Sequence, residues 1–269
     1  MRITIPIRRY VTHAAEGVSN IEANFGYVHR SVDIDSRQTA LVLVDCWDHH
    51  YIESWLARAK EVMTNRLAPL AAACRDAGIL VIHAPGKNVA ERYADWMDDP
   101  DDWNRNQTDG WPPADFVARK DSYSDLHWAA EPAMSPELAD WMDYSSNRMM
   151  IYRDVAPVAG DSVIATGDQL HSLLRKKGIF HLLYAGFATN WCVLNKDYGF
   201  RAMTWLGYNG VILRDGTTAV ETHESYTTEQ MRDFAVLTME MTMGYSSSVE
   251  ELIGSLKSAV DSAEAAAVR

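Results

Sequence analysis

Short runs of consecutive apolar residues alternate along this chain with stretches in which apolar positions recur every three or four residues. Five runs have the length of buried strands: 39–46, 79–84, 149–152, 182–185 and 211–213. Helical spacing is found over 56–77, 166–177, 191–205, 221–243 and 249–267. Strands that alternate with helices predict an α/β fold, here a doubly wound, mainly parallel sheet with helices on both faces.

Local signals support the ends of two of these helices. Thr166 and Gln169 have the spacing of a capping box, and Gly178 follows two lysines as a C-terminal stop. The stretch after Cys192 is expected to be one helix that ends near Gly207, with an apolar stripe of Trp191, Leu194, Tyr198, Ala202 and Trp205. Cys192 would then lie in the first turn of that helix.

The pattern divides the chain into three parts. Residues 1–38 show no sustained period, and we interpret them as an extended arm over the surface or across to another subunit, or as a frayed terminus. Residues 39–248 form the main α/β domain, which carries an irregular insertion over 87–144 that is rich in Asp, Trp and Pro. Residues 249–269 form a C-terminal helix. The arm and this helix favour a homo-oligomer.

Composition excludes several classes of protein. With 269 residues, of which 47% are hydrophobic, the chain has room for one sizeable domain. A net charge of −12 disfavours nucleic acid and anionic membranes as partners. No run is apolar enough to span a bilayer or to serve as a signal peptide, so we expect a cytoplasmic protein. The three cysteines have neither disulfide-framework nor metal-site spacing.

Cys192 is the residue placed best for chemistry. It follows a buried strand and a turn of small residues, at the start of the predicted helix. There, unpaired backbone N–H groups and the helix dipole favour an anion, which would lower the thiol pKa and help hold a developing oxyanion. The alternative is that Cys192 is a small buried hydrophobic residue.

The segment GFATNWCV, residues 186–193, resembles the nucleophile loop of the isochorismatase-like cysteine hydrolases, the superfamily of nicotinamidases, N-carbamoylsarcosine amidases and ureidoacrylate hydrolases. LVLVD at 41–45, IHAPGK at 82–87 and VILRD at 211–215 are also similar to this superfamily, over about residues 38–220. The resemblance implies the isochorismatase-like, Rossmann-like three-layer fold. It also implies hydrolysis of a C–N bond in a small amide, ureide or carbamoyl compound through a thioester.

The resemblance assigns roles to residues at the ends of two strands. Asp45 is the general base for the Cys192 thiol, and it needs a pKa raised toward neutrality by burial. The backbone N–H groups of Ala188 and Cys192 form the oxyanion hole, and a cis peptide bond is expected near Phe187 and Ala188.

Several side chains near these strand ends are candidate substrate contacts. Trp47 and His50 follow Asp45 on the same loop, where a flat aromatic ring and an imidazole suit a small planar amide. Thr189 and Trp191 are further candidates beside the cysteine. In the resembling family Asp215 has a mostly structural role.

The family's third catalytic residue is a lysine, and this sequence departs from the pattern there. The residue after the strand 149–152 is Arg153, whose planar, permanently charged guanidinium is a poor proton donor. Lys120, in FVARKDSYSDL, lies in a locally similar segment but requires a long insertion after it. We take Lys120 as the candidate and keep Arg153 as the alternative.

Metal and cofactor sites are not expected. Asp48, His50 and His83 suggest the metal ligands of nicotinamidases, but their spacing differs from that pattern. Isochorismate-type vinyl ether hydrolysis and a noncatalytic ligand-binding role stay open as alternatives. The sequence has neither a G-x-S-x-G elbow nor a G-x-G-x-x-G fingerprint, which disfavours an unrelated hydrolase or dehydrogenase.

Overall fold

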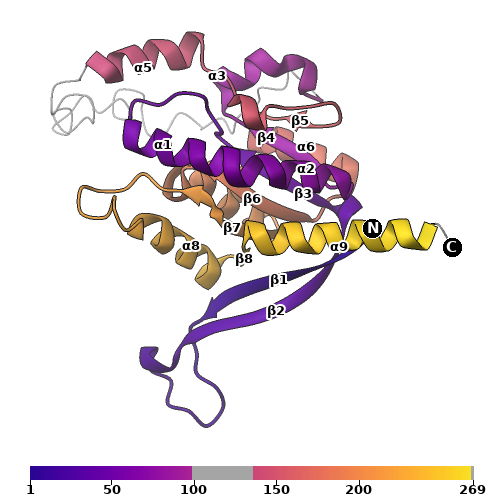
Figure 1. Ribbon diagram of the computed structural model, residues 1–269. Helices are drawn as coiled ribbons and strands as arrows, with labels where there is room; N and C mark the ends of the chain where they lie inside the picture. Colours follow the sequence, from indigo (N-terminus) through magenta and orange to yellow (C-terminus); the bar gives the residue numbers. More distant parts are fainter. Residues whose placement is uncertain (99–135, 268–269) are drawn as a thin grey trace, which may run out of the picture.

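The computed structural model describes residues 1–98 and 136–267, and in this part of the chain eight strands form one sheet (Figure 1). The strand order is β2-β1-β8-β7-β6-β3-β4-β5. Their bounds are β1 Arg2–Val11, β2 Gly26–Asp35, β3 Thr39–Val44, β4 Leu80–Ala84, β5 Ser162–Val163, β6 His181–Phe187, β7 Asn209–Thr218 and β8 Tyr245–Ser247. From β8 to β5 all neighbours are parallel, so the predicted doubly wound, mainly parallel sheet is confirmed.

Helices cover both faces of this sheet, as the pattern predicted. Their bounds in the described residues are α1 Glu53–Val62, α2 Ala68–Asp76, α3 Lys87–Ala90, α5 Pro136–Asn147, α6 Gly167–Lys177, α7 Phe200–Trp205, α8 Gln230–Thr242 and α9 Val249–Ala267. The π-helical segment η3, Met63–Leu67, joins α1 to α2. One core cluster lies beneath α1, α2 and α9, and a second lies beneath α6, α7 and α8. Each face of the central strands is therefore buried, which explains their unbroken apolar runs.

Two predicted helices form where their spacing placed them. In the stripe over 56–77, the side chains of Ala59, Met63, Leu67, Leu70 and Cys74 are buried. In α6, the Thr166 hydroxyl accepts the N–H of Gln169, and Gly178 ends the helix in the left-handed conformation. The apolar spacing and the capping residues predicted these helices correctly, because each signal depends on residues within one or two helical turns.

The first 38 residues form a long antiparallel hairpin, β1 and β2, joined to the parallel strands through Arg8 opposite Ser246. In Figure 1 this hairpin extends away from the helical layers. Alternate residues of β1 are buried, including Ile3, Ile5 and Ile7, which contribute to the core under α9. The segment therefore belongs to the sheet. In the first half of β1 every second side chain is buried, as in a strand with one face on the core.

The predicted strand over 149–152 is wrong, because this segment makes only an isolated antiparallel bridge between Ile151 and Trp47 and does not join the sheet. Two further bounds differ from the prediction. The strand expected to close at Asp215 continues to Thr218, and the Asp215 carboxylate accepts the N–H of Val249 at the start of α9. This contact fits the structural role implied for Asp215. The helix expected from residue 221 begins at Gln230, because the Glu221 carboxylate accepts the N–H groups of Met231 and Arg232 and so caps α8 from outside.

In the part of the chain that the structure describes, no helix combines the length and apolar character needed to cross a lipid bilayer.

Candidate active site

Asp45 lies directly after β3, at the carboxyl end of a central strand. Its backbone has a φ of 45°, a left-handed conformation that Asp tolerates better than most residues, and its N–H donates to the Ala84 carbonyl. The side chain is buried, and burial raises the pKa of the carboxyl group to about 6. The ammonium group of Lys196, the Cys192 thiol and the Tyr198 hydroxyl each lower this pKa. The predicted shift of Asp45 toward neutrality is confirmed.

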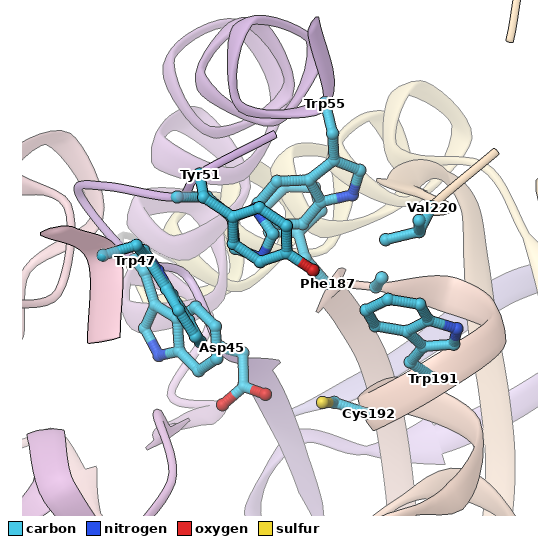
Figure 2. Close-up of a pocket in the computed structure, with 11 residues that line it drawn as sticks. Asp45, Trp47, Tyr51, Trp55, Phe187, Trp191, Cys192 and Val220 are labelled. Carbon is cyan, nitrogen blue, oxygen red and sulfur yellow. The ribbon is translucent and has the colours of Figure 1, made fainter. Parts of the chain in front are cut away.

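Cys192 is delivered to Asp45 by the turn that follows β6. A Cβ atom on Gly186 would lie 2.1 Å from the Val44 carbonyl oxygen, so glycine lets β6 and β3 approach closely just before Asp45. The Phe187–Ala188 peptide bond is cis, as the resemblance implied. In Figure 2 the Cys192 sulfur and the Asp45 carboxylate point toward one another.

The Cys192 thiol has a raised pKa, so the expectation that a helix N-terminus would lower it is wrong. Burial is the largest cause, and the Asp45 carboxylate adds to it, while Lys196 and the Ala188 backbone N–H lower the pKa by less. Cys192 lies in a short π-helical turn, η7, Thr189–Val193, not in the first turn of a long helix. The resting sulfur is therefore a thiol, and its proton must leave as it attacks.

The predicted continuous helix from Cys192 to Trp205 is interrupted at residues 196–199, and α7 begins only at Phe200. A Cβ on Gly199 would lie 2.9 Å from the Lys196 backbone nitrogen, so glycine allows the chain to fold back over its own turn. The expected apolar stripe is wrong at both ends, because Trp191 is 47% exposed and Trp205 is 77% exposed.

This interruption brings Lys196 and Tyr198 to the pair of Asp45 and Cys192. A Cβ on Gly86 would lie 3.6 Å from Asp45 Oδ1, 3.8 Å from the Tyr198 hydroxyl and 4.0 Å from Lys196 Nζ, so all three groups surround one glycine. Lys196 lines a cavity of about 760 Å³ that is distinct from the cavity beside Cys192. Sequence reasoning missed both residues, although the spacing of four between Cys192 and Lys196 was a usable signal.

Arg153, the alternative predicted cation, does not lie at this pair. Arg153 is 88% exposed and contacts Asp154 at 3.4 Å, far from a role in a buried site. Its backbone begins a short 3-10 turn that points the guanidinium to solvent. Lys120 lies outside the described residues, so its role as a catalytic lysine stays a prediction.

A cavity of about 460 Å³ opens beside Cys192, with Asp45, His50, Ala188 and Val220 among the residues that line it. Its walls are otherwise aromatic: Trp47, Tyr51, Trp55, Trp141, Phe187 and Trp191. Figure 2 shows Tyr51 and Trp55 across the cavity from Cys192. Such a cavity suits a flat apolar group, with few polar contacts to orient it.

Three of the predicted substrate contacts, Trp47, His50 and Trp191, line this cavity. Trp47 is held by its indole N–H, which donates to the Pro85 carbonyl at 2.8 Å. Thr189 is fully buried behind the cavity and does not line it. Its hydroxyl donates to Thr217, whose own hydroxyl donates to the Gly186 carbonyl.

His50 is a neutral imidazole in this setting. Burial, with a smaller effect of His49, lowers its pKa to about 4. The Ile52 backbone N–H donates to His50 Nδ1 at 3.1 Å, which fixes the ring proton on Nε2. Rings of Trp55, Tyr51 and Trp141 surround the imidazole at centroid distances of 4.4 to 5.4 Å.

The other residues considered as metal ligands have separate partners. The Asp48 carboxylate accepts the Tyr144 hydroxyl and the Met150 N–H, while His83 contacts the buried Asp161 carboxylate at 3.0 Å. Within the described ranges, no group of three or more His, Cys, Asp or Glu side chains has the arrangement of a metal site.

Sequence comparison finds two relatives that match part of the chain. Ureidoacrylate amidohydrolase RutB from Yersinia enterocolitica is 40% identical over 85 residues, which are 29% of this chain and 33% of that protein. The RutB of Serratia proteamaculans is 38% identical over 85 residues, 29% of this chain and 31% of that protein. The chain thus matches about a third of the length of either relative.

A solved structure shares the fold. The cysteine hydrolase from Pseudomonas syringae pv. phaseolicola has a TM-score of 0.52 at 16% sequence identity, over 84% of this chain and 95% of that one. The family model described as "Isochorismatase domain" matches residues 39–243, which include Asp45 and Cys192. With this match over most of its length, the chain belongs to the isochorismatase domain family.

Proposed function

We propose that this protein is a cysteine-dependent hydrolase that cleaves a C–N bond of a small amide, ureide or carbamoyl compound through a thioester. The observation that carries the proposal is the buried Asp45 carboxylate, with its raised pKa, facing Cys192 at an aromatic cavity. The names of the two partial relatives support a C–N bond as the target.

In the first half of the reaction Asp45 accepts the thiol proton as the Cys192 sulfur attacks the substrate carbonyl carbon. The backbone N–H groups of Ala188 and Cys192 stabilise the oxyanion of the tetrahedral intermediate. Protonated Asp45 then gives its proton to the departing nitrogen, the C–N bond breaks and a thioester remains. A pKa of about 6 suits a group that both accepts and returns a proton near neutral pH.

In the second half a water molecule attacks the thioester carbonyl while Asp45 takes a proton from that water. The C–S bond breaks, the proton returns to the sulfur, and the acid product leaves. Lys196 contributes a positive charge beside Asp45, which keeps the carboxylate from becoming too basic to ionise. We assign this positioning role to Lys196 because it approaches the carboxylate from outside the aromatic cavity.

The pH dependence follows from Asp45. We expect kcat/KM to rise with pH through about 6, because the carboxylate must be ionised to accept the thiol proton. Initial rates between pH 4.5 and 8 under subsaturating substrate measure this limb. A profile that is flat over this range would contradict Asp45 as the base.

Replacing Lys196 by methionine is expected to lower kcat by roughly 10- to 100-fold and to move the acid limb to higher pH, since the cation that lowers the Asp45 pKa is gone. Lys196→Arg should keep the limb near its original position. Lys177→Met, at the exposed end of α6, is the matched control. Lys120→Met is measured alongside, and an effect confined to that variant would assign the cation to Lys120 instead.

The proposed reaction is tested by ammonia or amine release from a panel of small amides, carbamoyl amino acids, ureides and nicotinamide. Release by the wild-type protein that is lost in Cys192→Ala supports a cysteine amidohydrolase. Hydrolysis of a vinyl ether by both proteins, without amide turnover, would instead support the isochorismate-type reaction.

We also propose that the protein self-associates. The ten-residue strand β2 lies at an edge of the sheet, half of its residues are exposed, and such edges are sites of pairing. Light scattering coupled to size exclusion measures the mass directly, and a monomer of 30.2 kDa at micromolar concentration would contradict this part.

A further inference from the structure

The two oxygens of the buried Asp45 carboxylate accept no hydrogen bond of ordinary geometry from a residue that the structure describes. Buried polar atoms are rarely left without a partner, so both oxygens call for a donor. Figure 2 shows one oxygen toward the Cys192 sulfur and the other turned away from it. The proposed reaction gives the first oxygen the thiol proton. It assigns no hydrogen-bond donor to the second.

The Tyr198 hydroxyl and the Lys196 ammonium group lie near the second oxygen. A Cβ atom on Gly86 would lie 3.6 Å from Asp45 Oδ1, 3.8 Å from the Tyr198 hydroxyl and 4.0 Å from Lys196 Nζ. Oδ1 is therefore the oxygen on the side of these two residues. Both residues line the cavity of about 760 Å³, and neither lines the aromatic cavity beside Cys192. They approach Asp45 from outside the space proposed for the substrate.

Tyr198 is held more firmly than Lys196. Its side chain is 1% exposed and packs in the core cluster beneath α6, α7 and α8, and its backbone carbonyl accepts the Tyr184 hydroxyl at 2.8 Å. Lys196 is exposed, and its ammonium group is carried by a flexible four-carbon stem. A carboxylate can rotate about one bond, so a donor fixed beside Oδ1 decides where Oδ2 points. The packed phenol suits this task better than the ammonium group does.

On the basis of the proposed function, we infer that Tyr198 is a positioning residue for the catalytic base. Its hydroxyl donates to Asp45 Oδ1 and leaves Oδ2 facing the Cys192 thiol. Oδ2 then accepts the thiol proton and later gives it to the departing nitrogen, while Tyr198 keeps its own proton throughout. Lys196 supplies positive charge beside the carboxylate, and Tyr198 supplies its direction.

Replacing Tyr198 by phenylalanine is expected to change the pH profile, which a purely structural tyrosine would not do. The Tyr198 hydroxyl lowers the Asp45 pKa, so its loss should move the acid limb of kcat/KM to higher pH by about 0.5 unit or more. We expect kcat to fall by roughly 10-fold, because the base is no longer aimed at the thiol. KM should change by less than about 2-fold, because Tyr198 lies outside the aromatic cavity.

Other titratable groups that the structure places near Asp45 do not obscure this limb. Cys46 follows Asp45 on its own loop, and His50 lines the same cavity. Burial raises the pKa of the Cys46 and Cys192 thiols and lowers that of His50 to about 4. Lys196 is unchanged in the variants compared. Initial rates between pH 4.5 and 8 therefore follow the ionisation of Asp45.

Tyr184→Phe is the matched control. It also removes a buried hydroxyl, the one that donates to the Tyr198 carbonyl, and this hydroxyl has no assigned contact with Asp45. It should cost stability in urea unfolding and leave the acid limb where it is in the wild type. An equal shift of the limb in both variants would show an effect of packing and would overturn the positioning role.

Alkylation of Cys192 by iodoacetamide reads the same pair without turnover. Its rate between pH 4.5 and 8, followed by mass spectrometry of the Cys192 peptide, should rise through the same limb and shift in the same direction in Tyr198→Phe. If no amide is hydrolysed but this shift is found, the proposed function fails and the positioning role stands. Amide turnover with an unshifted limb in both assays leaves the function standing and removes the positioning role.

Labelling the wild-type protein with 3-fluorotyrosine decides the question if Tyr198→Phe does not fold. Fluorine makes the phenol a stronger hydrogen-bond donor and keeps the side chain, so the acid limb of alkylation should move to lower pH. A limb that stays in place or moves to higher pH in the labelled protein would overturn the inference.

Discussion

Replacement of Cys192 by alanine is expected to abolish C–N bond hydrolysis, with kcat lower by about 10⁴-fold or more, because the sulfur that attacks the substrate carbonyl is removed. Cys46 and Cys74 are buried in the core, and neither lines the cavity beside Cys192. The variant should remain folded, since Cys192 is only partly buried and packs at the edge of the second core cluster. Steady-state ammonia release and far-ultraviolet circular dichroism measure the two properties.

The control for this prediction is Cys74→Ala, which alters a core thiol in α2 and leaves the site intact. It should lose stability, by roughly 1 to 2 kcal/mol for a buried small side chain, and keep its turnover number at temperatures where it is folded. If Cys192→Ala retained wild-type turnover on the same substrate, the thioester route would be excluded for this protein.

Replacement of Asp45 by asparagine is expected to reduce kcat by about 10²- to 10⁴-fold and, at the same time, to stabilise the fold above neutral pH. Asparagine keeps the shape of the side chain but cannot accept the thiol proton. The opposite change in stability follows from burial, which raises the Asp45 pKa from 3.8 to about 6. A carboxyl group with a raised folded-state pKa favours folding when protonated and costs stability once ionised.

The stability gained by Asp45→Asn depends on pH. Below about pH 4 the carboxyl is protonated in both the folded and the unfolded chain, so Asp45 carries no penalty. Between about 4 and 6 the unfolded chain ionises first, and above about 6 the full cost of roughly 3 kcal/mol is present. Asp45→Asn should therefore exceed the wild type most at pH 8 and least near pH 4.5, in urea unfolding at both values. A variant that is both inactive and less stable at pH 8 would contradict a desolvated carboxylate at this position.

The pairing of Asp45 with Cys192 could be predicted because both residues follow strands that the apolar pattern marks clearly. Asp45 and Cys192 come directly after the buried runs that became β3 and β6, and parallel neighbours must present their ends at one sheet edge. The aromatic character of the site was also visible, since Trp47 and His50 follow Asp45 on one loop. These inferences needed only strand identity and the polarity of a parallel sheet.

The position of Lys196 beside Asp45 could not be predicted, because it depends on a break in the helix that the apolar spacing does not reveal. Leu194 and Tyr198 fit the helical spacing and are buried, yet the chain between them leaves the helix at Lys196. The reason is a packing contact at Gly199, where any side chain would meet the backbone of Lys196 and the Cys192 carbonyl. The apolar spacing predicts which residues are buried, but it does not predict the backbone conformation between them.

The predicted lowering of the Cys192 pKa was wrong for a related reason. A helix N-terminus lowers a thiol pKa where the thiol is partly solvated, but here burial and the neighbouring Asp45 carboxylate act in the opposite direction and are larger. Residue position along the chain predicted the pairing of acid and thiol. The direction of the thiol pKa shift could not be predicted, because it depends on how far the cavity walls bury the sulfur. Those walls come from α1, α5 and the turn after β6.

The central claim is that Cys192 forms a covalent acyl intermediate, and mass spectrometry of the acid-quenched enzyme tests it most directly. Wild-type protein is mixed with an accepted amide, quenched within one turnover and digested. The peptide containing Cys192 should gain the mass of the acyl group, and Asp45→Asn should accumulate it more slowly. An unmodified Cys192 peptide at every quench time, in an enzyme whose Cys192→Ser variant turns over as fast as the wild type, would contradict the account.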